Sequence, residues 1–336
     1  LVSLFGNNQI IGGSSPTRFY NLTTLNPALK TILVDSWVEN ILDITDSEIA
    51  LNANKMHLFN PNPNALLWNT GFVSGDSIGG YLLRSTNRSQ EYVFPVGSVA
   101  LLNIYRAVSF TPKNGDSAVY GVRLAATNAD NDFTGTGVTG ATGPFPLNQK
   151  DPLALDINPE FYHHIARFYG NTNGKAEVFY FNSDDPVDNE FNTLSLWDQS
   201  IPRWTITDFT KQQSTAGAAI GFPDKSMVSN SLNFGNEVYA LAIKDKIEVF
   251  VPQIFSPNGD GVNDVLYPFG NRYESLTFTI YNRWGEKVFE STSATDGWDG
   301  KFRGIDVQPG VYVYYLEGEI KEKGKISQKG DITLVR

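Results

Sequence analysis

The chain has 336 residues, no cysteine and a net charge of −10, with 13% aromatic and 18% charged residues. This length exceeds what one hydrophobic core usually organises, so we expect two or three domains. The acidic balance argues against nucleic acid and anionic lipid surfaces as partners, because both are bound through clustered Lys and Arg. Without cysteine, disulfide bonds, thiolate catalysis and cysteine-ligated zinc are excluded. No apolar run approaches the roughly 20 residues of a membrane-spanning helix.

Residues 1–80 predict the first part of an all-β fold. The sequence is rich in aromatic residues, Gly and Pro, which favours strands joined by tight turns. Strand signals recur at 19–23, 31–34 and 49–52, a spacing typical of a β-solenoid or a short-stranded sandwich. The segment 19–23 (FYNLT) is similar to a strand that leads into stacked parallel turns in surface proteins of the Bacteroidetes.

Residues 81–248 predict a β-sandwich. A strand core at 238–243 is bounded by turn residues. Pro95 lies inside an apolar run and marks an edge strand or a bulge, because proline has no N–H for a strand ladder. The order of Arg84, a Phe-Pro-Val-Gly strand and the pair Tyr105-Arg106 resembles the same group of surface proteins.

The sequence of residues 158–169 is compatible with either a helix or a strand. Asn158 before Pro159 is typical of a helix start, and the aromatic and aliphatic residues that follow fit one helix face up to Gly170. The resemblance to surface proteins places a strand there instead. We predict the strand.

The pattern becomes regular from residue 249 onward. Residues 276–281 (LTFTIY) alternate with period two, which predicts a half-buried strand. In this register Leu276, Phe278 and Ile280 point into a core, and Thr277 and Thr279 face solvent. The chain ends in a strand signal, so we expect its terminus to be part of a sheet.

A series of motifs follows in order within residues 249–336. They are FSPNGDGVND at 255–264, YNRWG at 281–285, GWDGK at 297–301, PGVY at 309–312 and KGDITLVR at 329–336. Together they resemble the gliding-motility-associated C-terminal domain, which is the type B sorting domain of the type IX secretion system. The motif residues that carry the resemblance are Pro257, Asn258, Gly259, Asp260, Gly261, Asn263, Asp264, Trp284, Gly285, Trp298, Asp299, Gly300, Gly310 and Tyr312.

This resemblance implies a fold, a destination and partners. It implies an Ig-like β-sandwich over 249–336 and export through the outer membrane to the surface of a Bacteroidetes cell. The implied partners are the type IX translocon and a SprF-like outer-membrane β-barrel protein. Members with this tail are often long adhesins, some of them used in gliding. Because the chain starts at Leu1 without a leader, we expect it to be the C-terminal part of such a protein, with any glycan or surface ligand bound by a missing N-terminal region.

The loop 256–264 has two possible interpretations, a metal site and a rigid turn. Ser256, Asn258, Asp260 and Asp264 place oxygen atoms at the spacing of the first nine positions of a calcium loop. Against calcium, the first position is Ser, and no Glu follows at the twelfth. The alternative is a rigid turn in which Pro, Asn and Asp fix the backbone.

Enzyme signatures are missing, so we expect no enzyme. There is no G-x-S-x-G, no H-E-x-x-H and no phosphate-binding loop. The alternative is a secreted polysaccharide hydrolase or carbohydrate-binding protein. A hydrolase of this kind needs two facing carboxylates. The candidates Asp184, Asp185, Asp188 and Glu190 surround Pro186 in what we predict to be a solvated loop.

Two further patterns have a structural interpretation. The adjacent His163 and His164 face opposite ways on a strand and cannot share an ion. Trp284, Trp298 and residues 312–315 could form a sugar platform, although aromatic residues on strands more often pack in cores.

We also expect the tail to meet its partner through sheet edges. Basic and acidic residues nearly balance in 250–336, so most of the net charge of −10 lies in the preceding residues and the tail has no large field for steering. The terminal strand 331–335 is the predicted edge for pairing with a partner strand.

Overall fold

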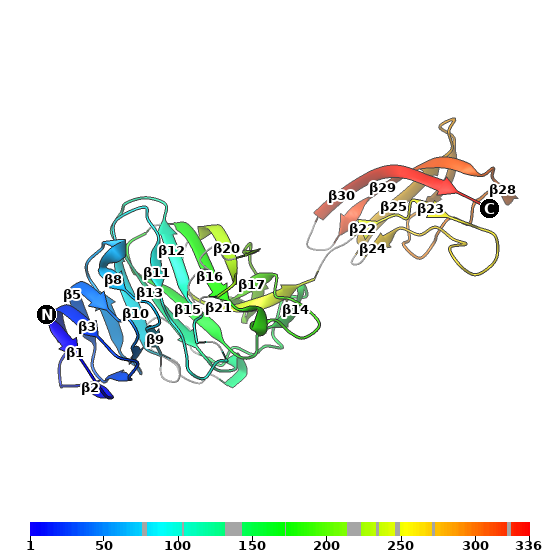
Figure 1. The fold of residues 1–336 in the computed structure, drawn as a ribbon. Coiled ribbons are helices and arrows are strands. Elements are labelled where there is room, and N and C mark those ends of the chain that lie inside the picture. Colours follow the sequence, from blue (N-terminus) through cyan, green and yellow to red (C-terminus); the bar gives the residue numbers. More distant parts are fainter. Residues whose placement is uncertain are drawn as a thin grey trace. The chain divides into compact units, whose positions relative to one another are not determined.

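The computed structural model describes residues 1–75, 79–102, 104–131, 143–171, 173–213, 223–232, 235–245, 249–270, 273–320 and 324–336. These residues form strands β1 to β30 and three short 3₁₀ turns, so the expected all-β class is confirmed (Figure 1). Within the same ranges, no helix is long and apolar enough to cross a membrane. The chain divides into two compact units, Leu1–Asp245 and Lys246–Arg336.

The first unit begins as a β-solenoid-like stack. Its early strands alternate between two sheets, so each coil adds a strand to both. One sheet contains β1 (Val2–Leu4), β3 (Thr17–Thr24), β5 (Ser36–Asp43) and β7 (Lys55–Leu58), and the other contains β2 (Gln9–Ile11), β4 (Lys30–Ile32), β6 (Glu48–Ala50) and β9 (Phe72–Ser74). The neighbouring strands run parallel, as expected for residues 1–80.

A ladder of asparagines connects successive coils. The Asn40 side-chain amide donates to the Asn21 carbonyl oxygen, 19 residues earlier, at 2.9 Å. Asn60 in turn donates to Asn40, 20 residues earlier, at 3.0 Å. Val38 and Leu58, which pair in the same register, are fully buried inside the coils. Successive coils therefore place apolar side chains in the interior and an asparagine whose side chain is hydrogen-bonded to the asparagine of a neighbouring coil.

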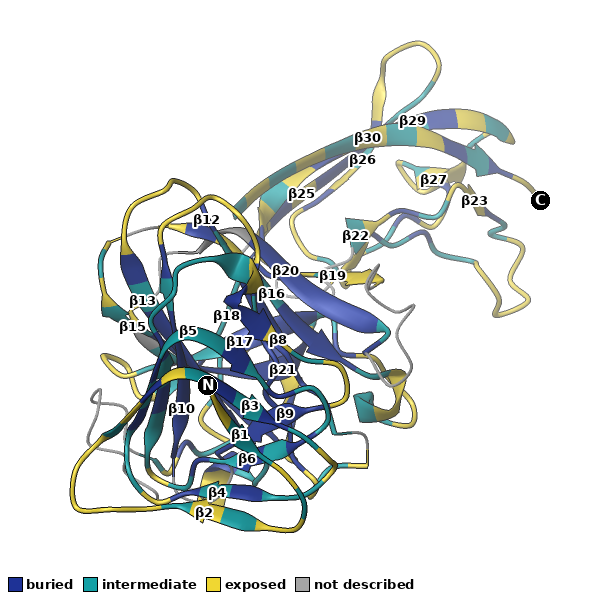
Figure 2. Cartoon of the chain, turned by 60° about the vertical axis from the view of Figure 1, so that its left-hand side comes forward, coloured by how far each residue is buried: buried dark blue, intermediate teal, exposed yellow. Residues whose placement is uncertain are grey.

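The rest of the first unit is a sandwich of two sheets. The first sheet of the solenoid continues through β10 (Tyr81–Thr86), β13 (Ala118–Ala125), β15 (Tyr162–Tyr169), β21 (Asn236–Lys244), β17 (Thr193–Asp198) and β18 (Arg203–Ile206), and with β8 (Leu66–Leu67) and β14 (Ala154–Ile157) it has 12 strands. The second has five, in the order β11 (Tyr92–Phe94), β12 (Val108–Pro112), β16 (Gly174–Tyr180), β20 (Lys225–Leu232) and β19 (Thr210–Gln213). Buried residues concentrate on β13, β15 and β16 (Figure 2).

The solenoid coils and the sandwich share one core. Strand β10 pairs in parallel with β7 and antiparallel with β13, so the sheet passes through residue 80 without a break. Apolar residues of the coils and of both sandwich sheets belong to a single buried cluster. Residues 1–80 are therefore packed onto the end of the sandwich.

Arg84 connects the last coil to the second sheet. Its side chain is 2% exposed, and its guanidinium donates to the Val93 carbonyl at 2.8 Å and the Pro63 carbonyl at 2.7 Å. It lies 5.2 Å from the centre of the Tyr92 ring. Burial lowers the pKa of Arg84 to about 10. Because a buried cation without acceptors is costly, these carbonyls fix where the coil meets the sandwich.

Two local predictions for the first unit are confirmed. Residues 162–169 form strand β15, and the Asn158 side chain accepts from the N–H groups of Glu160 and Phe161 at 2.7 and 3.2 Å. This residue thus makes a turn before a strand with the same bonds that would cap a helix. Pro95 directly follows β11, which is the edge strand of its sheet.

The second unit is built on a five-stranded sheet. The order is β23 (Ile254–Phe255), β30 (Gly324–Leu334), β29 (Gly310–Ile320), β25 (Tyr273–Tyr281) and β26 (Lys287–Ser291). Two short pairs accompany it: β22 (Val249–Phe250) with β24 (Phe269–Gly270), and β27 (Lys301–Phe302) with β28 (Ile305–Asp306). The unit has its own apolar core. The Ig-like topology stays a prediction.

The register of β25 is confirmed with one exception. Leu276, Phe278 and Ile280 are buried, and Thr277 is exposed. The expectation that Thr279 faces solvent is wrong, because its side chain is only 7% exposed. It lies on the outward face opposite Tyr315, where the Tyr281 and Tyr315 rings meet at 5.7 Å and cover it.

The terminal strand is not a free edge, which corrects the expected pairing surface. Strand β30 pairs along its length with β29. On its other side Thr333 donates its N–H to the Gln253 carbonyl at 2.7 Å, and Val335 donates to the Phe255 carbonyl at 3.1 Å. Residues 331–335 therefore lie inside the sheet, because the short β23 returns to cover them.

We predict that Phe278→Ala lowers the free energy of unfolding of the second unit by about 3–5 kcal/mol, because a fully buried ring is removed from a packed core. The neighbouring Thr277→Ala is the control and should change it by less than about 0.5 kcal/mol. Amide hydrogen exchange of β29 in the full chain reports the difference. Equal exchange rates in the two variants would contradict the register.

Candidate functional site

The Asp264 carboxylate organises the loop that opens the C-terminal motifs. One oxygen accepts the Gly259 N–H at 2.7 Å, and the other accepts the Gly261 N–H at 2.8 Å. Both glycines have positive φ, +81° and +84°, a region that residues with a Cβ seldom adopt. These donors lower the pKa of the Asp264 carboxyl below its usual value. The spacing of Gly and Asp is therefore what the loop geometry requires.

The other candidate calcium ligands also form hydrogen bonds within this loop. Asn258 Oδ1 accepts the Asp260 N–H at 3.0 Å, and Asp260 Oδ1 accepts the Val262 N–H at 2.7 Å. Ser256 contributes its backbone N–H to the Asn263 carbonyl at 3.0 Å. Across the described ranges, no three His, Asp or Glu residues group as a metal site. These contacts support the turn interpretation, which we favour, and calcium binding stays the untested alternative.

Trp298 is the centre of the second unit. Its side chain is fully buried, and its indole N–H donates to the Lys301 carbonyl at 2.9 Å. Its ring centre lies 5.3 Å from that of Phe255 and 4.9 Å from that of Tyr312. Its backbone exchanges two hydrogen bonds with Leu266. The motifs at 255–264, 297–301 and 309–312 therefore meet at one side chain.

Gly300 packs closely against the first motif and the last strand. Its φ is +74°, and a Cβ at this position would lie 2.7 Å from Pro257 Cγ and 3.1 Å from Leu334 Cδ1. Its carbonyl accepts from the Arg336 guanidinium at 3.1 Å and from the Val307 N–H at 3.0 Å. Any larger residue would have to displace the first motif or the last strand.

The YNRWG motif forms the turn between β25 and β26. The Asn282 side chain accepts the N–H groups of Trp284 and Glu286, both at 3.0 Å. Gly285 has φ +79°, as its place in the turn predicts. The Trp284 side chain takes no part in this bonding and is 80% exposed.

A cavity of about 420 Å³ lies beside this turn. It is lined by Asn282, Arg283 and Trp284 of the turn, by the segment 307–312, and by Val288 and Phe302. We call this cavity the Trp284 groove. Two motifs that are separate in sequence, YNRWG and PGVY, thus border one surface feature.

Residues 249–334 match the family model of the CHU_C type IX secretion signal domain. The second unit is a type IX secretion signal domain. It directs secretion through the outer membrane, to the cell surface or the extracellular space. A comparison of the chain with curated proteins finds no match.

Three of the five aromatic residues considered for a sugar platform belong to the core of the signal domain. Trp298, Tyr312 and Tyr314 are buried, whereas Trp284 and Tyr315 are 80% and 44% exposed. The core-packing interpretation therefore describes all but two of the residues considered for a sugar platform. Phe302, which lines the Trp284 groove, could not be predicted as part of a site, because nothing in its local sequence distinguishes it.

The acidic loop of the first unit differs from its prediction. Asp184 pairs with Arg106, and Asp185 pairs with Lys225; the side chains of these two acids are only 3% and 9% exposed. Burial raises the pKa of the Asp184 carboxyl, although Arg106 acts against this shift. The expectation that the loop is solvated is therefore wrong for these two residues. The partners lie 78 and 40 residues away in sequence, beyond any local pattern.

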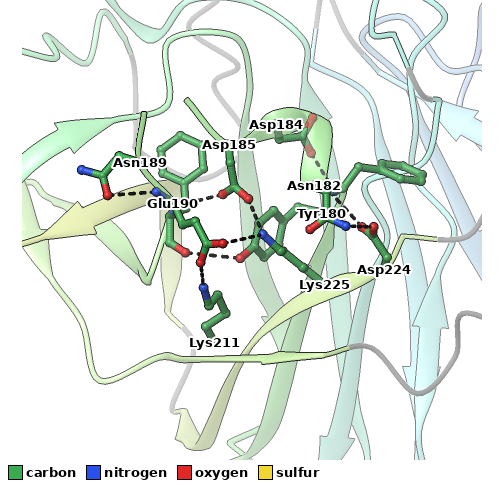
Figure 3. Close-up of polar contacts among 11 residues, drawn as sticks. Tyr180, Asn182, Asp184, Asp185, Asn189, Glu190, Lys211, Asp224 and Lys225 are labelled. Atoms are coloured by element: carbon green, nitrogen blue, oxygen red, sulfur yellow. Dashed lines mark hydrogen bonds and ion pairs between the residues drawn. The ribbon is translucent and has the colours of Figure 1, made fainter. Parts of the chain in front are cut away.

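Lys225 joins two carboxylates of this loop. It lies between Asp185 and Glu190, whose Oε1 is 3.7 Å from Lys225 Nζ (Figure 3). Glu190 also pairs with Lys211. The Phe191 N–H donates to Asp185 at 2.9 Å. Each carboxylate thus has a fixed cation or N–H partner, an arrangement that holds a loop in place.

The histidine pair lies on opposite faces of β15, as expected. His163 Nε2–H donates to the Arg106 carbonyl at 2.7 Å, while the His164 ring packs near Tyr162, with ring centres 5.4 Å apart. Burial lowers the pKa of His163 to about 4. Both rings therefore act as buried core groups.

We predict that acid weakens the signal domain through Asp264. Its lowered pKa means that the unfolded chain binds the proton more tightly, so this stabilisation is complete above about pH 4 and is lost as the pH falls further. Asp264→Asn should lower the melting temperature at neutral pH and reduce its fall on acidification. Melting in millimolar Ca²⁺ and in chelator should coincide. A rise in melting temperature with Ca²⁺ that Asp264→Asn abolishes would establish the calcium interpretation instead.

Proposed function

We propose that this chain is the C-terminal part of an adhesin-like surface protein of a Bacteroidetes bacterium, associated with gliding and not an enzyme. The observation that carries the proposal is the match of residues 249–334 to the type IX secretion signal domain. In this proposal the signal domain delivers the protein and attaches it to the surface. In this proposal the delivered protein binds a glycan or another surface molecule.

The first unit supports a structural role. Its coils and its sandwich enclose one continuous apolar core, and residues such as Leu22, Val178 and Leu241 fill the space between the sheets. The carboxylates considered for hydrolysis, Asp184 and Asp185, are each paired with a cation. A glycosidase needs one carboxylic acid and one carboxylate free to reach the sugar. These features fit a rigid spacer better than an active site.

The partners that we propose are the type IX translocon and a SprF-like outer-membrane β-barrel protein. The signal domain has a folded core of its own. A partner would therefore recognise a shaped surface, not an extended tail. This supports recognition by a dedicated outer-membrane protein.

We predict that delivery depends on this partner. Cells with the type IX system should expose the full chain to external protease, whereas cells lacking the SprF-like protein should retain it in the periplasm. A second type IX substrate with a different signal domain is the control, and its export should not change. Normal surface exposure of the chain without the SprF-like protein would refute the dependence.

A further inference from the structure

Trp284 has no structural task that explains its exposure. The turn is made by the Asn282 side chain and by Gly285, and only the backbone of Trp284 contributes to it. The indole is 80% exposed, and its contact among the described residues is with the guanidinium of Arg283, 5.0 Å from the ring centre. Exposed Trp and Arg side chains are the residue types most enriched at the energetic centres of protein interfaces.

The groove beside Trp284 offers apolar contacts to a partner. Val311 is 56% exposed at its border, and Val307, Pro309 and Phe302 add apolar surface to the lining. A volume of about 420 Å³ accommodates a few side chains rather than a domain. The shape therefore fits a short segment of a partner protein.

One arginine lines the groove, and a second rests on the ring of the lining residue Phe302 without being part of the lining itself. Arg283 is the charged residue in the lining, and Arg303 lies 4.8 Å from the centre of the Phe302 ring. Within the described part of the chain, the ion pairs of the signal domain involve Lys287, Lys301 and Arg336, but neither of these two arginines. Both guanidinium groups rest on aromatic rings and remain available to carboxylates.

The nearby acidic residues already have partners. Glu286 accepts from the Asn282 amide at 3.1 Å, and Asp306 pairs with Arg336 at 3.4 Å. Arg336 offsets the charge of Asp306, whereas the neutral Asn282 amide leaves the charge of Glu286 in place. Within the described residues, neither acid forms an ion pair with Arg283 or Arg303, although the chain as a whole has a net charge of −10. The balanced charge of the domain conceals this local site, because net charge averages over position.

We propose that the Trp284 groove binds an extended acidic peptide segment of the secretion machinery. The carboxylates of the segment would pair with Arg283 and Arg303, and one apolar side chain would pack against Trp284 and Val311. This inference rests on the proposed function, in which a partner recognises the folded signal domain. It replaces strand pairing at 331–335, which the sheet already covers.

A binding experiment with the purified full chain tests this chemistry. The probe is a fluorescein-labelled peptide of alternating Glu and Leu residues with a central Pro, compared with the same peptide carrying Lys in place of Glu. We expect the acidic probe alone to bind. Trp284→Ala should weaken binding about tenfold or more, and Arg283→Glu should abolish it and permit binding of the basic probe. The controls Tyr315→Ala and Lys329→Ala, on the outward sheet face, should bind like the native chain. Equal binding of both probes, or none of the acidic one, would overturn the proposal.

An export assay separates this inference from the proposed function. Arg283→Glu and Trp284→Ala should fold, with melting temperatures near that of the native chain, yet reach the surface at a small fraction of the native level. Native-level export of folded Arg283→Glu would refute the groove while leaving the signal function intact. Surface exposure of a chain without residues 249–336 would instead refute the proposed function itself.

Discussion

The burial of the Trp298 side chain is the constraint on which the signal domain depends. Phe255 and Tyr312 pack against its ring, and the Lys301 carbonyl accepts its indole N–H. Gly300 then lies so close to Pro257 and Leu334 that the first motif, the third motif and the last strand have little freedom relative to one another. Motifs that are spread over the sequence therefore form one structural object. What a partner can recognise is the surface that this packing leaves outside, and Trp284 is its most prominent apolar side chain.

The sequence predicted features that depend on local geometry. Alternation in 276–280 placed Leu276 and Phe278 in the core, and Pro95 marked an edge strand, because both follow from the chemistry of neighbouring residues. Features that depend on distant residues were not predictable. Thr279 is covered by Tyr315 from another strand, and Asp184 is paired with Arg106, 78 residues away. The Trp284 groove likewise exists only because folding brings the turn at 281–285 to the segment 307–312.

In the first unit, packing likewise joins segments that are distant in sequence. A stack of coils leaves the apolar residues of its last coil uncovered. Here β7, in that coil, pairs in parallel with β10, so the sandwich covers them. Arg84 then fixes the junction by donating to carbonyls of the coil and of the second sheet. The two compact units have separate cores, and the match to the secretion signal domain lies entirely in the second unit.

The most direct measurement is protease accessibility on intact cells that have the type IX system. The full chain and a chain ending at Asp245, each supplied with a signal peptide for export to the periplasm, are compared for cleavage by external protease. The account predicts that the full chain is cleaved and that the shorter chain is protected inside the cell envelope although its unit is folded. Equal cleavage of both chains on intact cells would contradict the claim that residues 249–336 carry the signal for secretion.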